Sequence, residues 1–328
     1  MESSPKTPPP LVIDFDDNRL LNALFGEHDR HIATIEHRLD VSISSRGNRI
    51  AIIGQVWSQR TTQTVLNGLY SRLLKGFSVT DADVDAAIRM AEGGDSCASL
   101  SDQVVIRTRR GTITPRSANQ KQYVLEMQKD ELLFALGPAG TGKTFLAVGV
   151  AVSMLMGGHV DRIVLSRPAV EAGERLGFLP GDIRDKVDPY LRPLYDALYL
   201  MMPADQVSKR LNNGEIEIAP VAFMRGRTLA NSFVIVDEAQ NTSPVQMKML
   251  LTRLGEGSRM IVTGDLSQID LPEGTPSGLA EAVHILEGTQ GIGVVRLNEN
   301  DVFRHTLVTK IIRAYNGKDT KQKGARNG

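Results

Sequence analysis

The sequence contains one cysteine, Cys97, which excludes an intrachain disulfide and therefore a small fold stapled by disulfides. It also carries no net charge, because 38 lysines and arginines balance 38 aspartates and glutamates. A global attraction to nucleic acid is therefore not expected, and any such binding has to come from local patches. No apolar run approaches the ~20 residues of a membrane-spanning helix, so no membrane partner is expected.

Two further kinds of signal are missing. Three of the six histidines, His28, His31 and His37, share one segment, but their spacing without cysteines is not that of a zinc site. The N-terminal stretch MESSPKTPPP lacks the apolar core of a signal peptide, and we interpret residues 1–10 as a disordered, proline-rich leader. Together with the lone cysteine, this predicts a cytoplasmic protein.

Composition and periodicity divide the rest of the chain into two domains. Residues 11–92 predict a small α+β domain, in which a strand and two helices precede a hairpin with a polar turn at 45–48 and a closing helix. Residues 93–115 are small, polar or basic and are interpreted as a linker. Residues 116–316 predict a second domain, and residues 317–328 a basic, disordered tail.

The second domain has the pattern of an α/β fold. Short apolar runs, ELLFAL, IVL, FVIV and MIVTGD, alternate with helical segments. Strands that alternate with helices favour a parallel sheet with crossover helices, and unbroken apolar runs are typical of strands buried on both faces. The polar residues that follow such strands meet at one edge of the sheet, where open α/β sheets bind their ligands.

A glycine-rich loop directly after the first of these strands matches the pattern G-x-x-x-x-G-K-[ST] at every fixed position. Its glycines let several backbone N–H groups point at one phosphate, and the following helix adds its positive end. We expect the lysine to reach the β- and γ-phosphates of a nucleotide and the last threonine to coordinate Mg²⁺. The loop consists of Gly137, Pro138, Ala139, Gly140, Thr141, Gly142, Lys143 and Thr144.

The stretch FVIVDEAQ places two carboxylates at the end of a buried strand. Burying two unpaired carboxylates costs free energy, so both are expected at the carboxyl end of the strand, close to a cation. The phosphate loop supplies that cation: Asp237 is predicted to hold the Mg²⁺ bound by Thr144, and Glu238 to polarise the attacking water. The alternative is an ordinary pair of surface acids at a strand end.

Two further positions are candidates for contact with the nucleotide. Gln268 follows the strand MIVTGD, and it could sense the γ-phosphate, although a polar strand end explains it too. Asn119 and Gln120 lie shortly before the first strand, where a side-chain amide can pair with the adenine edge as donor and acceptor. A solvated helix start is the competing interpretation of that pair.

The motifs GPAGTGKT, VDEAQ and VTGDLSQ, in this order, resemble those of RecA-like superfamily 1 helicases. The resemblance to PhoH-like proteins is closer, and it extends through NQKQY, SRPAVEAGERLGFLPG, FMRGRT, LLTRLGEGS and DVFRH, over about residues 116–316. It implies a RecA-like P-loop NTPase core, a cytoplasmic ATPase that uses ATP and Mg²⁺ in RNA metabolism, and assembly as a hexameric ring. It also implies partnership with single-stranded RNA and with an endoribonuclease of ribosomal RNA maturation.

The N-terminal domain resembles the KH-like module of the longer PhoH relatives. A KH fold clamps the RNA backbone with a G-x-x-G loop between two helices. Here the loop reads Gly26-Glu-His-Asp29, so that the second glycine is absent and two acids have entered. Because these acids oppose the close approach of a phosphate, a docking or assembly role is favoured for this domain.

The chain has room for one RecA-like domain, whereas a superfamily 1 helicase closes two of them over ATP. In a ring, a neighbouring subunit can complete the site with an arginine placed against the γ-phosphate. The candidates are Arg167, Arg225, Arg227, Arg253 and Arg304. The hypothesis adopted here assigns this role to Arg304, in the motif DVFRH.

Two functional classes remain open. One is an RNA-directed ATPase or helicase, which the Gln268 segment and the ring favour. The other is a nucleotide-dependent interaction protein that controls a partner endoribonuclease without unwinding, which the zero net charge and the altered G-x-x-G loop favour.

Overall fold

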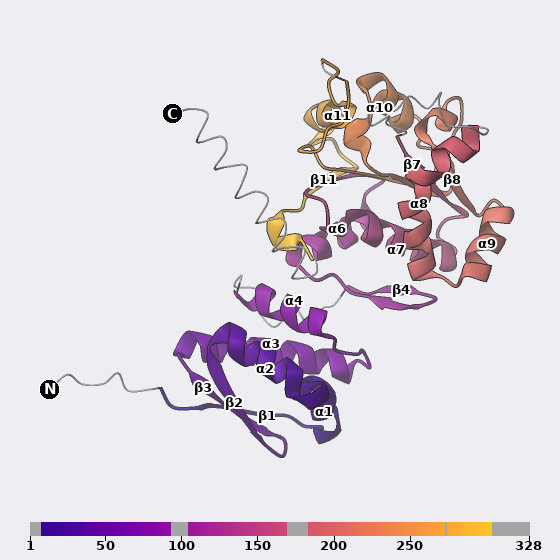
Figure 1. Ribbon diagram of the computed structural model, residues 1–328. Coiled ribbons are helices and arrows are strands. Elements are labelled where there is room, and N and C mark those ends of the chain that lie inside the picture. Colours follow the sequence, from indigo (N-terminus) through magenta and orange to yellow (C-terminus); the bar gives the residue numbers. More distant parts are fainter. Residues whose placement is uncertain (1–7, 93–103, 169–182, 273, 304–328) are drawn as a thin grey trace, which may run out of the picture. The chain divides into compact units, whose positions relative to one another are not determined.

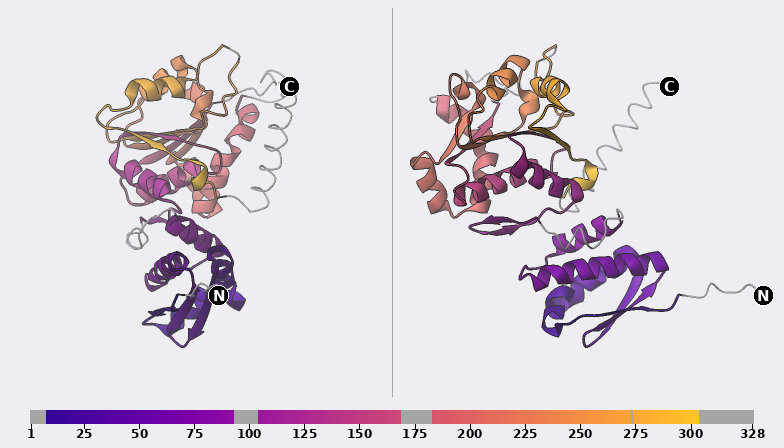
Figure 2. Two further views of the ribbon diagram at one scale, coloured as in Figure 1. Left: turned by 90° about the vertical axis from the view of Figure 1, so that its left-hand side faces the viewer. Right: turned by 180° about the vertical axis from the view of Figure 1, so that it is seen from behind.

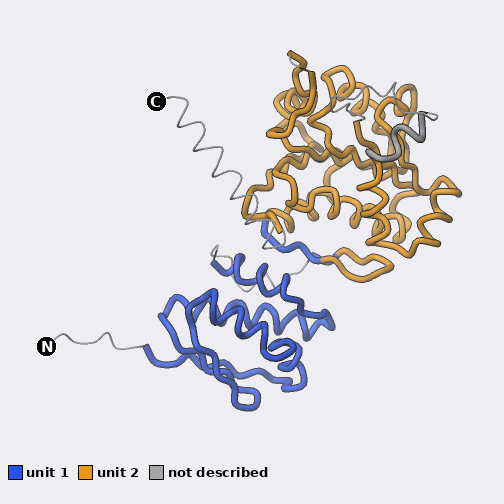
Figure 3. Tube along the Cα trace, viewed as in Figure 1, with its two compact units in different colours: residues 1–105, 114–118 blue, residues 106–113, 119–328 orange. Residues whose placement is uncertain are grey.

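The computed structural model describes residues 8–92, 104–168, 183–272 and 274–303, with the side chains of 183–190 left aside. Contacts divide the chain into two compact units: unit 1 holds residues 1–105 and 114–118, and unit 2 holds 106–113 and 119–328 (Figure 3). The predicted basic tail, most of the predicted leader and Arg304 lie outside the described residues. Within the described part, no helix combines the length and the apolar character needed to cross a bilayer.

Unit 1 has a three-stranded antiparallel sheet in the order β1-β3-β2. The order of its elements along the chain, a strand, two helices, a hairpin and a helix, is the predicted one. The elements are β1 (Leu11–Asp14), η1 (Asn18–Leu20), α1 (Leu21–Phe25), η2 (Glu27–Asp29), α2 (Arg30–Leu39), β2 (Val41–Arg46), β3 (Arg49–Gly54), α3 (Val56–Leu74) and α4 (Asp81–Glu92).

The core of unit 1 follows from side-chain periodicity. In α2 the buried residues Ile32, Ile35 and Leu39 recur on one helical face. In β3, Ile50 and Ile52 are fully buried and point to the face that the helices cover, as alternate residues of a strand do. Burying each such side chain contributes about 1.5–3 kcal/mol, so the apolar faces hold the sheet and helices together.

The loop between α1 and α2 has an unusual backbone. Gly26 has a φ of 76°, and the two non-glycine residues His28 and Asp29 have φ values of 54° and 56°. Glu27 and Asp29 are exposed, so this loop presents carboxylates at the position where a G-x-x-G loop presents backbone.

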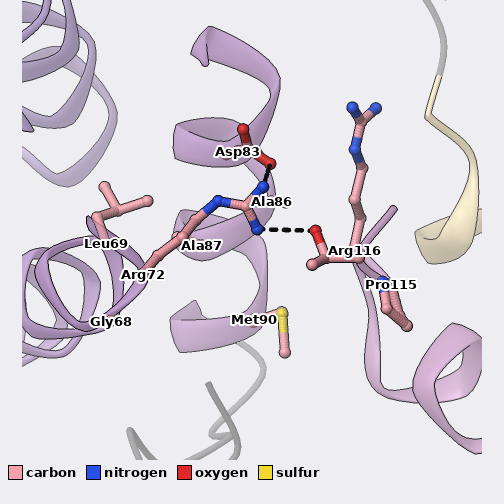
Figure 4. A pocket seen from close by; sticks show the side chains of 10 residues that line it. Gly68, Leu69, Arg72, Asp83, Ala86, Ala87, Met90, Pro115 and Arg116 are labelled. Atoms are coloured by element: carbon pink, nitrogen blue, oxygen red, sulfur yellow. Dashed lines mark hydrogen bonds and ion pairs between the residues drawn. The ribbon is translucent and has the colours of Figure 1, made fainter. Parts of the chain in front are cut away.

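A partly buried arginine joins three segments of unit 1. Arg72, on α3, donates from Nη1 to the hydroxyl of Thr114 at 2.7 Å and from Nε to the carbonyl of Ser78 at 2.8 Å. Its Nη2 lies 3.5 Å from Asp83 on α4, and both side chains are only 11–12% exposed. Figure 4 shows this arrangement in the pocket that Arg72 lines with Met90. The guanidinium therefore ties the segment at 114–118 to α3 and α4.

We expect Arg72→Ala to lower the free energy of unfolding of unit 1 by about 1–3 kcal/mol, because it removes the two hydrogen bonds and leaves the little-exposed carboxylate of Asp83 without its cation. Urea denaturation followed by the fluorescence of Trp57, the single tryptophan and a residue of α3, measures this change. Arg60→Ala removes an exposed arginine from the same helix and is expected to leave the midpoint in place. Equal midpoints for the two variants would contradict the role of Arg72.

The predicted linker at 93–115 is partly structured. Residues 93–103 lie outside the described part, but β4 (Ile106–Thr108) and β5 (Gly111–Ile113) form an antiparallel hairpin that belongs to unit 2. The hairpin packs on α7 at Gly149, where an added Cβ would lie 3.2 Å from Ile113 Cδ1. Strands of three residues are too short to show an alternating pattern, which is why the sequence indicated only a linker.

Unit 2 is built on a six-stranded sheet in the order β11-β6-β10-β9-β7-β8, and every pair in it is parallel. This confirms the predicted parallel α/β fold. Its elements after the hairpin are α6 (Ala118–Lys129), β6 (Leu132–Leu136), α7 (Lys143–Met156), β7 (Arg162–Arg167), α8 (Ile183–Met201), α9 (Ala204–Asn212), β8 (Ile216–Pro220), η4 (Val221–Met224), β9 (Ser232–Val236), η5 (Ala239–Asn241), α10 (Pro244–Leu251), β10 (Arg259–Gly264), α11 (Gly278–Leu286), β11 (Ile292–Arg296) and η6 (Glu299–Asp301).

Helices cover both faces of this sheet, with α10 and α11 on one side and α6, α7 and α8 on the other (Figures 1 and 2). Alternate residues of the central strands, such as Phe134, Val236 and Val262, pack toward α10 and α11. All five residues of β6 and of β9 are buried, which explains their unbroken apolar runs. Polar groups are thereby confined to the strand ends, and the carboxyl ends form one edge.

Candidate functional site

The glycine-rich loop connects β6 to α7 at the carboxyl edge of the sheet. Gly137 has a φ of 153°, and a Cβ on it would lie 2.6 Å from the carbonyl oxygen of Leu297, so only glycine fits there. Gly142 precedes α7 in the left-handed conformation, with a φ of 80°. The 14-residue helix α7 then begins at Lys143 and directs its positive end and unpaired N–H groups into the loop.

The ammonium group of Lys143 lies inside the loop. Its Nζ donates to the carbonyl oxygens of Gly137 at 2.6 Å and Pro138 at 2.9 Å. The hydroxyl of Thr141 also donates to Pro138, at 2.9 Å. These bonds fix the curvature of the loop around the lysine, and phosphate oxygens are the acceptors that best suit such a concentration of donors.

Asp237 lies at the end of β9, opposite the loop. It is 4% exposed, and its Oδ1 accepts hydrogen bonds from the hydroxyls of Thr144 at 2.6 Å and Thr263 at 2.7 Å. The structure thus brings together Thr144 and Asp237, which the sequence assigned to one metal ion. A hydroxyl and a carboxylate are hard oxygen donors, and Mg²⁺ takes one or two such protein ligands beside water and phosphate oxygens. The donor set therefore fits Mg²⁺.

Tyr123, on α6, forms a hydrogen bond with the backbone at the end of the loop. Its side chain is fully buried, and its hydroxyl donates to the carbonyl of Lys143 at 3.2 Å. Burial raises the pKa of this hydroxyl well above its ordinary value, and the charge of Asp237 adds to the effect. Tyr123 is therefore neutral and acts as a hydrogen-bond donor in the site.

Glu238 takes a backbone conformation that is rare for its residue type. Its φ of 53° and ψ of 37° are left-handed, which costs about 1–3 kcal/mol for a non-glycine residue and is found mainly at functional sites. Oε1 lies 3.5 Å from Nη2 of Arg167, at the end of β7, and Oε2 accepts from Nε2 of Gln240 at 2.6 Å. The carboxylate thus stands at the carboxyl edge with a fixed direction.

Gln240 had no predicted role, yet the structure places it at the centre of the site. The residue is 1% exposed, and besides Glu238 it contacts the loop that follows β10. Its Oε1 accepts from the backbone N–H of Asp265 at 3.1 Å, and its Nε2 donates to the carbonyl of Gln268 at 3.1 Å. Its place two residues after Glu238 was the only available signal, because its other two partners, Asp265 and Gln268, lie 25 and 28 positions away in the sequence.

Gln268 lies in that loop, where its Nε2 donates to Oδ2 of Asp265 at 2.5 Å. Burial by itself would raise the pKa of Asp265, but hydrogen bonds from the hydroxyl and N–H of Ser267 and from Gln268, with the charge of Lys143, lower it below the usual value. Asp265 is therefore an anion that holds Gln268 and Ser267. The predicted contact of Gln268 with a γ-phosphate stays a prediction.

The amides of Asn119 and Gln120, at the start of α6, face other parts of unit 2. Gln120 donates from Nε2 to the carbonyl of Thr141 at 2.9 Å, and Asn119 donates from Nδ2 to Oδ2 of Asp301 at 2.9 Å. Asp301 is 1% exposed, and the N–H of Phe303 donates to Gly140 at 3.2 Å. η6 therefore lies against α6, and Phe303, just after η6, lies against the glycine-rich loop. The hydrogen bonds expected between these two amides and adenine stay a prediction.

The candidate arginines fall into different environments. Arg227 forms two hydrogen bonds with Glu217, and Arg253 donates to the carbonyl oxygens of Met249 and Arg227. Arg167 faces Glu238 within the same chain. Arg225 is exposed and forms no hydrogen bond or ion pair within the described part of the chain. Arg304 lies outside the described residues.

Comparisons with known proteins identify a family and several relatives. Residues 112–316 match the model of the family described as PhoH-like protein. The chain is 49% identical to a PhoH-like protein of Bacillus subtilis, over 89% of this chain and 93% of that protein. It is 45% identical to a PhoH-like protein of Mycobacterium bovis, over 96% and 88%. Among solved structures, the Pif1 helicase from Candida albicans matches with a TM-score of 0.35 and 16% identity, over 61% of this chain and 43% of that one.

Proposed function

This chain belongs to the PhoH-like protein family, and from that premise we propose that it is a Mg²⁺-dependent ATPase that acts in RNA processing. The observation that carries the proposal is the pairing of Thr144 with Asp237 at 2.6 Å, beside a lysine-bearing phosphate loop. Thr144 follows β6 and Asp237 follows β9, the two strands that flank β10 in the sheet, and the two residues are 93 positions apart in the chain.

Each residue of the site has its own role in the proposed hydrolysis of ATP. Backbone N–H groups of the loop and Lys143 bind the β- and γ-phosphates and orient the terminal phosphoryl group. Thr144 and Asp237 would hold Mg²⁺, and the bound ion would supply positive charge against the phosphate oxygens. Glu238 orients the attacking water and accepts its proton at the carboxylate. Tyr123 and Thr263 keep the loop and Asp237 in place.

We assign an arginine from a neighbouring subunit to the γ-phosphate, in a ring that is expected to be hexameric. Arg304 remains the hypothesis from the sequence. Arg225 now competes with it, because its exposed side chain has no partner within the described part of the chain and follows η4 at the carboxyl edge of β8. Arg167, Arg227 and Arg253 are less suited to this role, because each is engaged within its own chain.

A second function is favoured by two features of unit 1. Exposed Glu27 and Asp29 stand in the loop that clamps RNA in a KH fold. In addition, the carboxylate of Glu36 accepts from the backbone N–H of Ile43 at 2.7 Å, on the edge strand β2. The loop acids place negative charge where a KH fold contacts the phosphate backbone, and the carboxylate of Glu36 occupies a backbone N–H of the edge strand. The alternative is therefore a nucleotide-dependent switch that regulates a partner endoribonuclease.

The test is the rate of ATP hydrolysis per chain across a range of protein concentrations, with and without single-stranded RNA, and with Glu238→Gln as the blank. We expect a rate that rises cooperatively with concentration, because a ring completes each site in trans, and that rises again with RNA. A rate that follows assembly but ignores RNA would favour the regulatory switch. No hydrolysis above the blank at any concentration would contradict the proposed ATPase.

A further inference from the structure

The side-chain amide of Gln240 uses its hydrogen-bonding groups on two different parts of the site. Its Nε2 donates to Oε2 of Glu238 at 2.6 Å and to the carbonyl of Gln268 at 3.1 Å. Its Oε1 accepts from the N–H of Asp265 at 3.1 Å. The orientation of the amide follows from chemistry, because a carboxylate only accepts and a backbone N–H only donates. The amide therefore bridges the end of β9 and the loop after β10.

We infer that Gln240 is a positioning residue, which sets the direction of the Glu238 carboxylate and makes it depend on the backbone of residues 265–268. This inference rests on the proposed ATPase function, in which Glu238 orients the water. A hydrogen bond to a charged group is stronger than one between neutral groups, and the amide that donates it belongs to a residue that is only 1% exposed. A displacement of the loop would therefore pull the amide away from Glu238.

The loop is partly exposed, so that contacts from outside can displace it. Leu266 and Ile269 are 39% and 42% exposed, so contacts from outside can reach the segment that carries Gln268. Its far end is held separately, because the N–H of Asp270 donates to Oδ1 of Asn241 at 2.8 Å. Gln240 and Asn241 thus anchor the same loop, but of these two residues only Gln240 also contacts the carboxylate of Glu238 among the described bonds, whereas Asn241 donates its backbone N–H to the carbonyl of Glu238.

The first test is Gln240→Glu, which keeps the size of the side chain and replaces the amide donor with an acceptor oxygen. We expect kcat for ATP hydrolysis to fall by about 10–100-fold, the effect of losing a hydrogen bond to a charged group. KM for ATP with Mg²⁺ is expected to stay within about threefold, because Gln240 contacts neither the phosphate loop nor Asp237 in the described structure. Gln246→Glu is the matched control, since Gln246 is exposed and caps α10 through an acceptor oxygen that glutamate retains.

A second variant distinguishes a loss of positioning from a loss of folding. Gln240→Asn introduces no charge and withdraws the amide by one methylene, so it is expected to show the same separation of kcat from KM. Thermal unfolding of both variants identifies any loss of structure. A positioning role also predicts non-additivity: in a Glu238→Gln background, Gln240→Asn should cause little further loss of kcat, because the group it orients is already absent.

Three results would overturn the inference. They are a kcat near the wild-type value in both Gln240 variants, a KM that rises as much as kcat falls, and an equal loss of kcat in the two Glu238 backgrounds. The wild-type rate reports separately on the proposed function. Absence of wild-type hydrolysis overturns the ATPase and the positioning role with it, whereas normal wild-type hydrolysis with unaffected variants overturns the positioning role alone.

Discussion

Lys143→Ala is expected to reduce ATP hydrolysis by about 10²–10³-fold or more and to weaken nucleotide binding, because it removes the one side-chain cation that the phosphate loop encloses in the described site. Its Nζ lies within 2.9 Å of two loop carbonyls, and phosphate oxygens would share that ammonium group. The loss is larger than for an exposed lysine, since a charge in a partly buried loop is less screened. Steady-state hydrolysis and the shift of the melting temperature by ATP with Mg²⁺ measure the two effects.

Lys129→Ala is the matched control for this substitution. Lys129 is 82% exposed at the end of α6, and its contact with Asp130 is a surface pair. We expect its hydrolysis and its nucleotide-induced shift to equal those of the wild type. A Lys143→Ala variant that still gains thermal stability from ATP to the wild-type extent would contradict the assignment of the phosphate loop.

Glu238→Gln is expected to lower kcat by about 10²–10⁴-fold, the usual contribution of a general acid or base, while nucleotide affinity changes little. The substitution removes charge and leaves shape, because the carbonyl oxygen of glutamine can still accept from Nε2 of Gln240. The variant should therefore fold normally and hold ATP without hydrolysing it. Single-turnover hydrolysis together with equilibrium nucleotide binding separates the chemical step from binding.

Glu256→Gln provides the control for loss of one negative charge, because Glu256 is exposed and lies before β10, at the amino end of that strand. Its kcat is expected to equal that of the wild type. A Glu238→Gln variant with a kcat near the wild-type value would mean that another group orients the water. The first group to test would then be Gln268, which lies in the neighbouring loop.

The parallel sheet and the phosphate loop could be predicted because both leave local signals. Strands buried on two faces show as unbroken apolar runs, and β6 and β9 are buried along their whole length. The loop has to contain glycine where backbone approaches backbone, as at Gly137 beside Leu297, so its pattern is readable in one stretch. The pairing of Thr144 with Asp237 followed from the rule that carboxyl ends of parallel strands share an edge.

Other parts of the fold left weaker signals. The hairpin β4–β5 has three residues in each strand and packs on α7 through the single apolar anchors Ile106 and Ile113, too few to show a period. Asp301 lies 182 positions from Asn119, its hydrogen-bond partner, and no spacing rule connects them. Tyr123 was visible only as the last residue of the motif NQKQY and had no predicted role, although its hydroxyl holds the backbone of Lys143.

The sequence by itself determined the parallel sheet and the glycine-rich loop at its carboxyl edge, because strand burial and loop curvature each restrict residue types locally. It also predicted which groups would bind phosphate and Mg²⁺, and that assignment stays a prediction. The tertiary structure decided how those groups are held. Gln240 contacts Glu238, Asp265 and Gln268, and Arg167 faces Glu238 instead of standing free for a neighbour. Hydrogen bonds between strand ends depend on how neighbouring strands align in space, and residue order along the chain does not contain that distance.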